Sequence, residues 1–137
     1  MDRYRRDLLA LVEGSFAARE SVQAILPFAN TLKRPKGPEG KVRTGVYQGY
    51  RRYRPLLLTD RRLFIFETGR TPHGRGVLAE FSNDDVRVTS VGPWRFRGTR
   101  LVLDLPGEGE VPFDLGRREL QDLDVLLAVL GYDEARQ

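Results

Sequence analysis

The 137-residue chain is long enough for one domain with its own hydrophobic core. It contains no cysteine, which excludes disulfide frameworks, thiolate zinc sites and cysteine nucleophiles. Its net charge of +4 is unevenly spread: residues 33–62 hold ten basic and two acidic residues, a balance of +8, whereas the rest of the chain holds 13 basic and 17 acidic residues, a balance of −4.

An amphipathic helix is predicted over residues 2–19, because apolar side chains recur there at helical spacing. Asp2 is a suitable N-cap, and the apolar face consists of Leu8, Leu9, Val12 and Phe16. The apolar run at 8–12 is too short for a signal sequence or a membrane span, so we expect a cytoplasmic protein. We expect the helix to pack on the domain. The alternatives are a helix that lies on a membrane or pairs with a second copy of the chain.

A first strand is predicted over residues 22–33, with an interruption at Pro27 because proline cannot donate to a strand ladder. Prolines and glycines then indicate a loop at 35–40. Residues 41–54 interleave tyrosines with arginines. This stretch is either a long basic strand leading into the following hairpin or an insertion.

A β-hairpin with largely buried arms is predicted over residues 56–66. Two short apolar runs rich in branched and aromatic residues flank the polar sequence Thr59-Asp60-Arg61-Arg62. Runs of that length favour strands over helices, and threonine and aspartate favour a turn because their side chains bond to nearby backbone.

Four further strands are predicted from period-2 alternation of apolar and polar residues. They cover residues 77–81, 86–89, 101–105 and 111–115. Trp94 and Phe96 either extend the third of these strands or form a loop before it. A closing helix is predicted over residues 117–130, with an apolar stripe and a glycine stop at Gly131. The stripe consists of Leu120, Leu123, Leu127 and Leu130.

The chain therefore predicts a mainly β domain with one helix at each end. Seven short strands without helical crossovers indicate an antiparallel barrel or sandwich, and the C-terminal helix is the right size to cap one opening. We treat residues 1–137 as a single domain: an N-terminal helix at 1–20, the barrel and capping helix at 22–131, and a basic loop or extended hairpin insertion at 34–54.

This order of elements, together with the strand–Thr-Asp-Arg-Arg-Leu–strand hairpin at 56–66, resembles the bacterial pleckstrin-homology-like (PH-like) domains. The resemblance covers residues 22–131 and implies a seven-stranded barrel that acts as a binding module. Eukaryotic members often bind phosphoinositides through the loop between the first two strands, where Lys33, Lys41 and Arg43 match the spacing of their basic residues. The tryptophan that those members place in the closing helix is missing here. Some bacterial relatives assemble into rings, so the resemblance also implies self-association.

The basic stretch at 33–62 is the predicted binding region, because several cations together attract an acidic surface. We expect an anionic lipid headgroup or an acidic protein as its partner, which would also permit a position at the membrane periphery. The candidate residues are Lys33, Lys36, Lys41, Arg43, Arg51, Arg52, Arg54, Tyr47, Tyr50 and Tyr53. The alternatives are nucleic-acid binding through the tyrosines and arginines of 41–54, a structural or oligomerisation role without an anionic ligand, and a solvated basic face.

Catalysis is not expected, and the sequence predicts no metal or other cofactor. The one histidine, His73, lies in a loop at 69–76 with no carboxylate or nucleophile beside it in the sequence. A minor anion site is a further hypothesis for Gly116, Arg117 and Arg118. Arginines at a helix start are unfavourable unless an anion occupies the free amides, with an arginine-rich composition as the alternative explanation.

Overall fold

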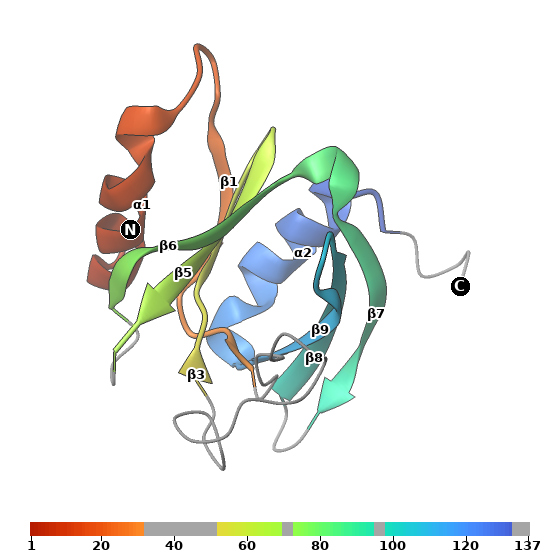
Figure 1. The fold of residues 1–137 in the computed structure, drawn as a ribbon. Helices are drawn as coiled ribbons and strands as arrows, with labels where there is room; N and C mark the ends of the chain where they lie inside the picture. Colours follow the sequence, from red (N-terminus) through yellow and green to blue (C-terminus); the bar gives the residue numbers. More distant parts are fainter. Residues whose placement is uncertain (32–51, 70–72, 95–97, 133–137) are drawn as a thin grey trace, which may run out of the picture.

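The predicted hairpin is at the centre of the first of two antiparallel sheets (Figure 1). In the computed structural model, which describes residues 1–31, 52–69, 73–94 and 98–132, β4 (Leu56–Thr59) pairs with β5 (Arg62–Thr68). β1 (Val22–Leu26) pairs with β4, and β6 (Gly74–Ser82) pairs with β5. The first sheet therefore has the order β1-β4-β5-β6, which confirms the hairpin.

The second sheet has the order β3-β2-β9-β8-β7, with neighbouring strands antiparallel. Its strands are β2 (Asn30–Thr31), β3 (Arg52–Tyr53), β7 (Arg87–Trp94), β8 (Gly98–Leu105) and β9 (Gly109–Leu115). A short 3-10 helix, η2 (Asn83–Asp85), joins β6 of the first sheet to β7 of the second. Trp94 is the last residue of β7, so it neither extends the strand at 101–105 nor lies in a loop before it, the two alternatives that the sequence left open. Phe96 lies outside the described residues.

The described residues contain nine strands, where the sequence predicted seven. The predicted interruption at Pro27 divides the first strand into β1 and β2, and β3 lies in the stretch at 41–54 that the sequence left open. Pro55 separates β3 from β4. Proline lacks an N–H for the ladder, and at both prolines the chain passes between the two sheets.

The main core lies between the two sheets and the C-terminal helix. Inward-facing side chains such as Leu58, Leu63, Leu101 and Phe113 are buried together in it, and so are Leu123 and Leu126 of α2 (Leu120–Val129). Figure 1 shows α2 between the two sheets. The predicted leucine stripe is shifted: Leu126 is completely buried, whereas Leu120 is 39 % exposed. The helix stops before Gly131, whose positive φ of 73° confirms the predicted glycine stop.

The N-terminal helix packs on the outer face of the first sheet, as expected. α1 (Arg3–Val12) begins at Asp2, whose side chain accepts a hydrogen bond from the Arg5 backbone N–H. Leu8 and Val12 are buried against Ile25, Leu57, Phe64 and Phe66. The predicted extension to residue 19 is wrong, because a 3-10 turn, η1 (Glu13–Ser15), ends the helix. Gly14 lies in that turn, where its low helix propensity fits the ending.

Candidate functional site

Most of the predicted binding region lies outside the described residues. This applies to Lys33, Lys36, Lys41, Arg43, Tyr47, Tyr50 and Arg51. The strands that flank it are described, and Thr31 at the end of β2 pairs with Arg52 at the start of β3. β3 is the edge strand of the second sheet among the described residues. Residues 31 and 52, the described residues on either side of the segment, therefore lie side by side at this end of the sheet.

Tyr53 and Arg54, at the end of the predicted binding region, take part in the fold. The Tyr53 carbonyl accepts hydrogen bonds from Thr68 Oγ1 at 2.9 Å and from Arg54 Nη1 at 3.0 Å. Arg54 is only 8 % exposed, and its backbone N–H donates to the Ala29 carbonyl at 2.8 Å. Tyr53 is half-buried. A docking residue needs its charge at the surface, and Arg54 does not offer it.

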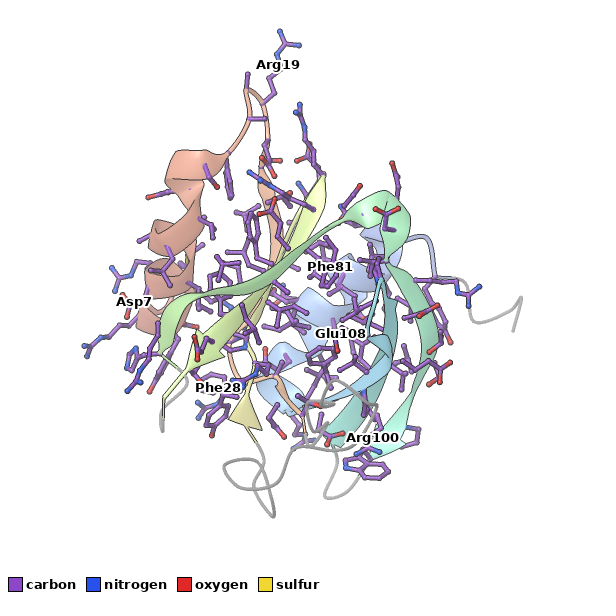
Figure 2. All side chains as sticks on the ribbon, in the orientation of Figure 1. Asp7, Arg19, Phe28, Phe81, Arg100 and Glu108 are labelled. Carbon is purple, nitrogen blue, oxygen red and sulfur yellow. The ribbon has the colours of Figure 1, made fainter. Side chains whose placement is uncertain are left out.

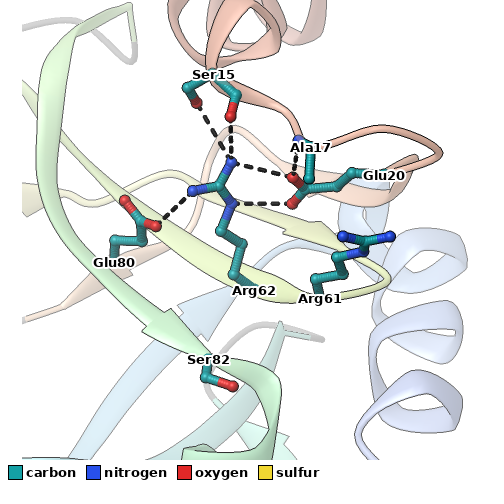
Figure 3. A pocket seen from close by; sticks show the side chains of 7 residues that line it. All are labelled: Ser15, Ala17, Glu20, Arg61, Arg62, Glu80 and Ser82. Carbon is teal, nitrogen blue, oxygen red and sulfur yellow. Dashed lines mark hydrogen bonds and ion pairs between the residues drawn. The ribbon is translucent and has the colours of Figure 1, made fainter.

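The turn of the central hairpin holds the segment between α1 and β1 (Figure 3). Thr59 Oγ1 accepts from the backbone N–H groups of Arg61 and Arg62, each at 3.0 Å, and lies 2.7 Å from Glu20 Oε2. Asp60 Oδ1 accepts from the Ser21 backbone N–H at 3.0 Å. The Thr-Asp-Arg-Arg sequence therefore both closes the hairpin and anchors the chain that enters the first sheet.

Arg62 is at the centre of this anchor. Its guanidinium donates to both carboxylate oxygens of Glu20, at 2.9 and 3.0 Å, to Glu80 Oε1 at 2.6 Å and to the Ser15 carbonyl at 2.8 Å. Burial alone would raise the pKa of Glu20, but the hydrogen bonds from Arg62, Thr59 and the Ala17 N–H, with the Arg62 charge, lower that pKa to about 2.

An open pocket of about 360 Å³ adjoins this anchor. It is lined by Ser15, Ala17, Glu20, Arg61, Arg62, Glu80 and Ser82 (Figure 3). The polar atoms of Arg62 and Glu20 that face it already bond to each other or to neighbouring protein groups. The pocket is thus the surface of a structural ion-pair network, and we do not assign it a ligand.

His73 has a carboxylate partner, which corrects the expectation from the sequence. Its Nδ1 lies 3.2 Å from Asp7 Oδ2, and its ring stacks on Tyr4 with 4.7 Å between ring centroids. Both partners belong to α1 and lie 66 and 69 residues from His73 in the sequence, so the sequence around His73 does not reveal them. The contact attaches the chain just before β6 to α1, which indicates a structural role for His73.

Two carboxylates of the C-terminal helix region bond to the edge strand β1 and to the residues just after it. Asp122 Oδ2 accepts from the Ile25 N–H at 2.9 Å, and Glu119 Oε1 accepts from the Phe28 N–H at 2.8 Å. Arg5 of α1 joins them, with its Nε 3.4 Å from Asp122 Oδ2. The sequence shows two acidic residues three apart at the start of a helix, which could have marked them as candidates. Their partners, the N–H groups of Ile25 and Phe28, depend on tertiary packing.

The hypothetical anion site at Gly116, Arg117 and Arg118 lies at this same helix start. All three residues are exposed, and a 3-10 turn, η3 (Arg117–Glu119), precedes α2. Arg118 lies over the Phe28 ring, 6.0 Å from its centroid. Asp122, in the first turn of α2, already supplies the negative charge that a helix start favours. The arginines at this helix start therefore do not require a bound anion.

Two further features of the described residues concern metal binding and membrane spanning. The described ranges contain no group of three or more histidine, cysteine, aspartate or glutamate side chains arranged to hold a metal ion. Among the same residues, no helix has the length and apolar character needed to cross a membrane. A scan against protein-family models and a search of curated proteins each found no match to this chain.

Proposed function

We propose that this chain is a non-catalytic binding module of PH-like fold that docks an acidic partner through the basic region at residues 33–62. The partner would be an anionic lipid surface or an acidic protein. The observation that carries the proposal is the charge distribution, +8 within residues 33–62 against −4 in the rest of the chain. Concentrated like charge repels itself in the free protein, and an anionic partner relieves that repulsion.

The PH-like part of the proposal is supported by the order of the elements. A strand–Thr-Asp-Arg-Arg-Leu–strand hairpin forms the centre of the first sheet, strands β7 to β9 of a second antiparallel sheet follow it in the sequence, and a C-terminal helix packs between the sheets. The two strands that continue from one sheet into the other at Pro27 and Pro55 account for nine strands in place of seven.

The described residues narrow the set that can dock a partner. Arg54 is buried, and Arg62 is engaged by Glu20 and Glu80. Both charges serve the fold, so the proposal assigns docking to the remaining basic residues of the region. These are Lys33, Arg34, Lys36, Lys41, Arg43, Arg51 and Arg52, with Arg61 at the hairpin turn. Tyr47 and Tyr50 accompany them as side chains suited to a headgroup interface.

The test is a binding series against anionic and uncharged vesicles, an acidic polypeptide and a single-stranded oligonucleotide, each across a range of salt. The variant Lys41→Glu/Arg43→Glu/Arg51→Glu reverses three charges of the proposed region without touching the buried Arg54. The control Arg3→Glu/Arg6→Glu/Arg19→Glu makes the same change in net charge at three exposed arginines near the N-terminus.

The wild type and the control should bind an anionic target, and binding should weaken as salt screens the charges. Each cation near an anionic membrane contributes about 1 kcal/mol, so losing three should reduce affinity by roughly 100-fold or more. Preference for the oligonucleotide over vesicles would favour the nucleic-acid alternative. Equal binding by all three proteins on every target would refute docking through this region.

A further inference from the structure

Glu119 is a buried carboxylate at a point where three elements meet. Its side chain is 0 % exposed. Oε1 accepts a hydrogen bond from the Phe28 N–H, just after β1, whereas Oε2 is buried and has no hydrogen-bond partner. A buried carboxylate oxygen without a hydrogen bond is costly when the group is ionised, because it loses water without a replacement.

The first turn of α1 covers this carboxylate. Arg5 Nη2 lies 3.9 Å from Glu119 Oε2, which is an ion pair without hydrogen-bond geometry. Tyr4 packs edge-on against Phe28, whose N–H holds the other oxygen, with 5.0 Å between ring centroids. The burial of Glu119 therefore depends in part on α1 remaining docked on the first sheet.

The charges around Glu119 oppose one another. Arg5 of α1 favours the ionised form, but Arg5 also pairs with Asp2 before α1 and with Asp122 of α2. Arg118 of η3 lies against the Phe28 ring, and His73 before β6 contacts Tyr4 and Asp7 on α1. Burial is the largest influence and raises the pKa of Glu119 from 4.5 to about 7; the Phe28 N–H and Arg5 lower it, and the Asp122 and Asp2 charges add to the rise.

We propose that Glu119 is a proton-responsive contact that couples the docking of α1 to pH near neutrality. The neutral carboxyl suits this buried site, where Oε2 has no hydrogen-bond partner, so α1 stays docked at mildly acidic pH. Ionisation favours the arrangement in which water reaches the carboxylate, so α1 undocks more often as the pH rises above neutral. Undocking uncovers the apolar outer face of the first sheet, formed by Ile25, Leu57, Phe64 and Phe66.

Amide hydrogen exchange, expressed as protection factors, measures this opening at about pH 5.5 and about pH 8. The reporters are the amides of α1, and the reference amides are those of β8 and β9 in the second sheet. Glu119→Gln keeps an acceptor for the Phe28 N–H and removes the titration. His73→Gln removes the one imidazole of the chain, the other side chain near α1 of a type that titrates in this range.

In the wild type and in His73→Gln, protection of the α1 amides should fall by tenfold or more between the two pH values, while β8 and β9 change less. Each pKa unit corresponds to tenfold, so a pKa that moves from about 7 with α1 docked to 4.5 with α1 undocked sets an upper limit of roughly 30-fold between about pH 5.5 and about pH 8. In Glu119→Gln the α1 amides should lose most of this dependence.

Three results would overturn the proposal. One is α1 protection that is independent of pH in the wild type. A second is a pH effect that disappears in His73→Gln, which would assign it to the imidazole. A third is an equal loss of protection in α1, β8 and β9, which would show that the whole domain opens together. If Glu119→Gln does not fold, the wild type and His73→Gln still decide between these outcomes.

Discussion

The two sheets differ in how many of their faces are covered. The first sheet is buried on both sides at its central strands β4 and β5: Leu58 and Leu63 face the main core, and Phe64 and Phe66 lie under α1. Among the described residues, the second sheet buries apolar side chains on its inner side, where Leu101 and Leu103 contribute to the main core. Its outer face carries the exposed ion pair Arg87–Asp104 and the more sheltered pair Arg100–Asp114, in which Asp114 is buried. Arg100 is labelled in Figure 2.

This difference explains two kinds of sequence pattern in one domain. β4 and β5 are continuous apolar runs because both faces of their sheet exclude water, whereas β8 and β9 alternate because one face remains wet. The N-terminal helix is consequently an integral layer of the structure. Without it, the side chains of Leu57, Phe64 and Phe66 would be exposed.

The largest expected effect comes from matched substitutions on the two outer faces. Phe64→Ala, under α1, should cost about 3–5 kcal/mol because the side chain is 1 % exposed and leaves a cavity. Val102→Ala, on the outer face of the second sheet, should cost less than about 1 kcal/mol because Val102 is already half-buried. Denaturant unfolding of both variants measures the difference, and equal costs would mean that α1 does not cover the first sheet.

The helix between the sheets offers a second comparison within one turn. Leu126→Ala should cost about 2–5 kcal/mol, since Leu126 is completely buried between both sheets. Leu127→Ala should cost roughly half as much, because Leu127 is only half-buried beside the same core. The same unfolding measurement checks which substitution costs more stability. A larger loss of unfolding free energy for Leu127→Ala would mean that the leucine stripe predicted from the sequence faces the core.

The anchor at the hairpin turn should make stability depend on acid pH. The pKa of Glu20 is about 2 in the folded protein and 4.5 ordinarily, so its contribution is complete above about pH 4.5 and is lost as the pH falls toward 2. Glu20→Gln should cost about 1–3 kcal/mol near neutral pH, since Arg62 keeps its bonds to Glu80 and Ser15. Unfolding midpoints across acid pH test this, and an unchanged acid slope in the variant would count against the pairing.

The smallest effect is expected on the wet face of the second sheet. Arg87 and Asp104 form an exposed ion pair at 3.6 Å, with side chains 76 % and 42 % exposed. Exposed pairs of this kind contribute about 0–1 kcal/mol, so Arg87→Ala should change the unfolding free energy by less than that. A loss well above 1 kcal/mol would show that the outer face of the second sheet is covered, and the contrast between the two sheets would fail.

The sequence by itself determined the elements that are stabilised by interactions between near neighbours in the chain. The hairpin at 56–66, the alternation at 101–105 and 111–115, the N-cap Asp2 and the stop at Gly131 all formed as predicted, because turn chemistry, strand period and helix capping act between near neighbours. The same reasoning explains the small errors. A 3-10 turn at Glu13–Ser15 ended a helix that periodicity alone had extended to residue 19, whereas the interruption predicted at Pro27 did form.

Contacts between distant segments were decided only by the tertiary structure. Glu20 meets Arg62, Asp7 meets His73, and Glu119 meets the Phe28 N–H, across separations of 42, 66 and 91 residues. Each pairing requires elements far apart in the sequence to be packed together before the groups can approach. Arg54 illustrates the consequence for function, because its charge looks like part of a binding surface in the sequence and is buried by the packing of β3 and β4.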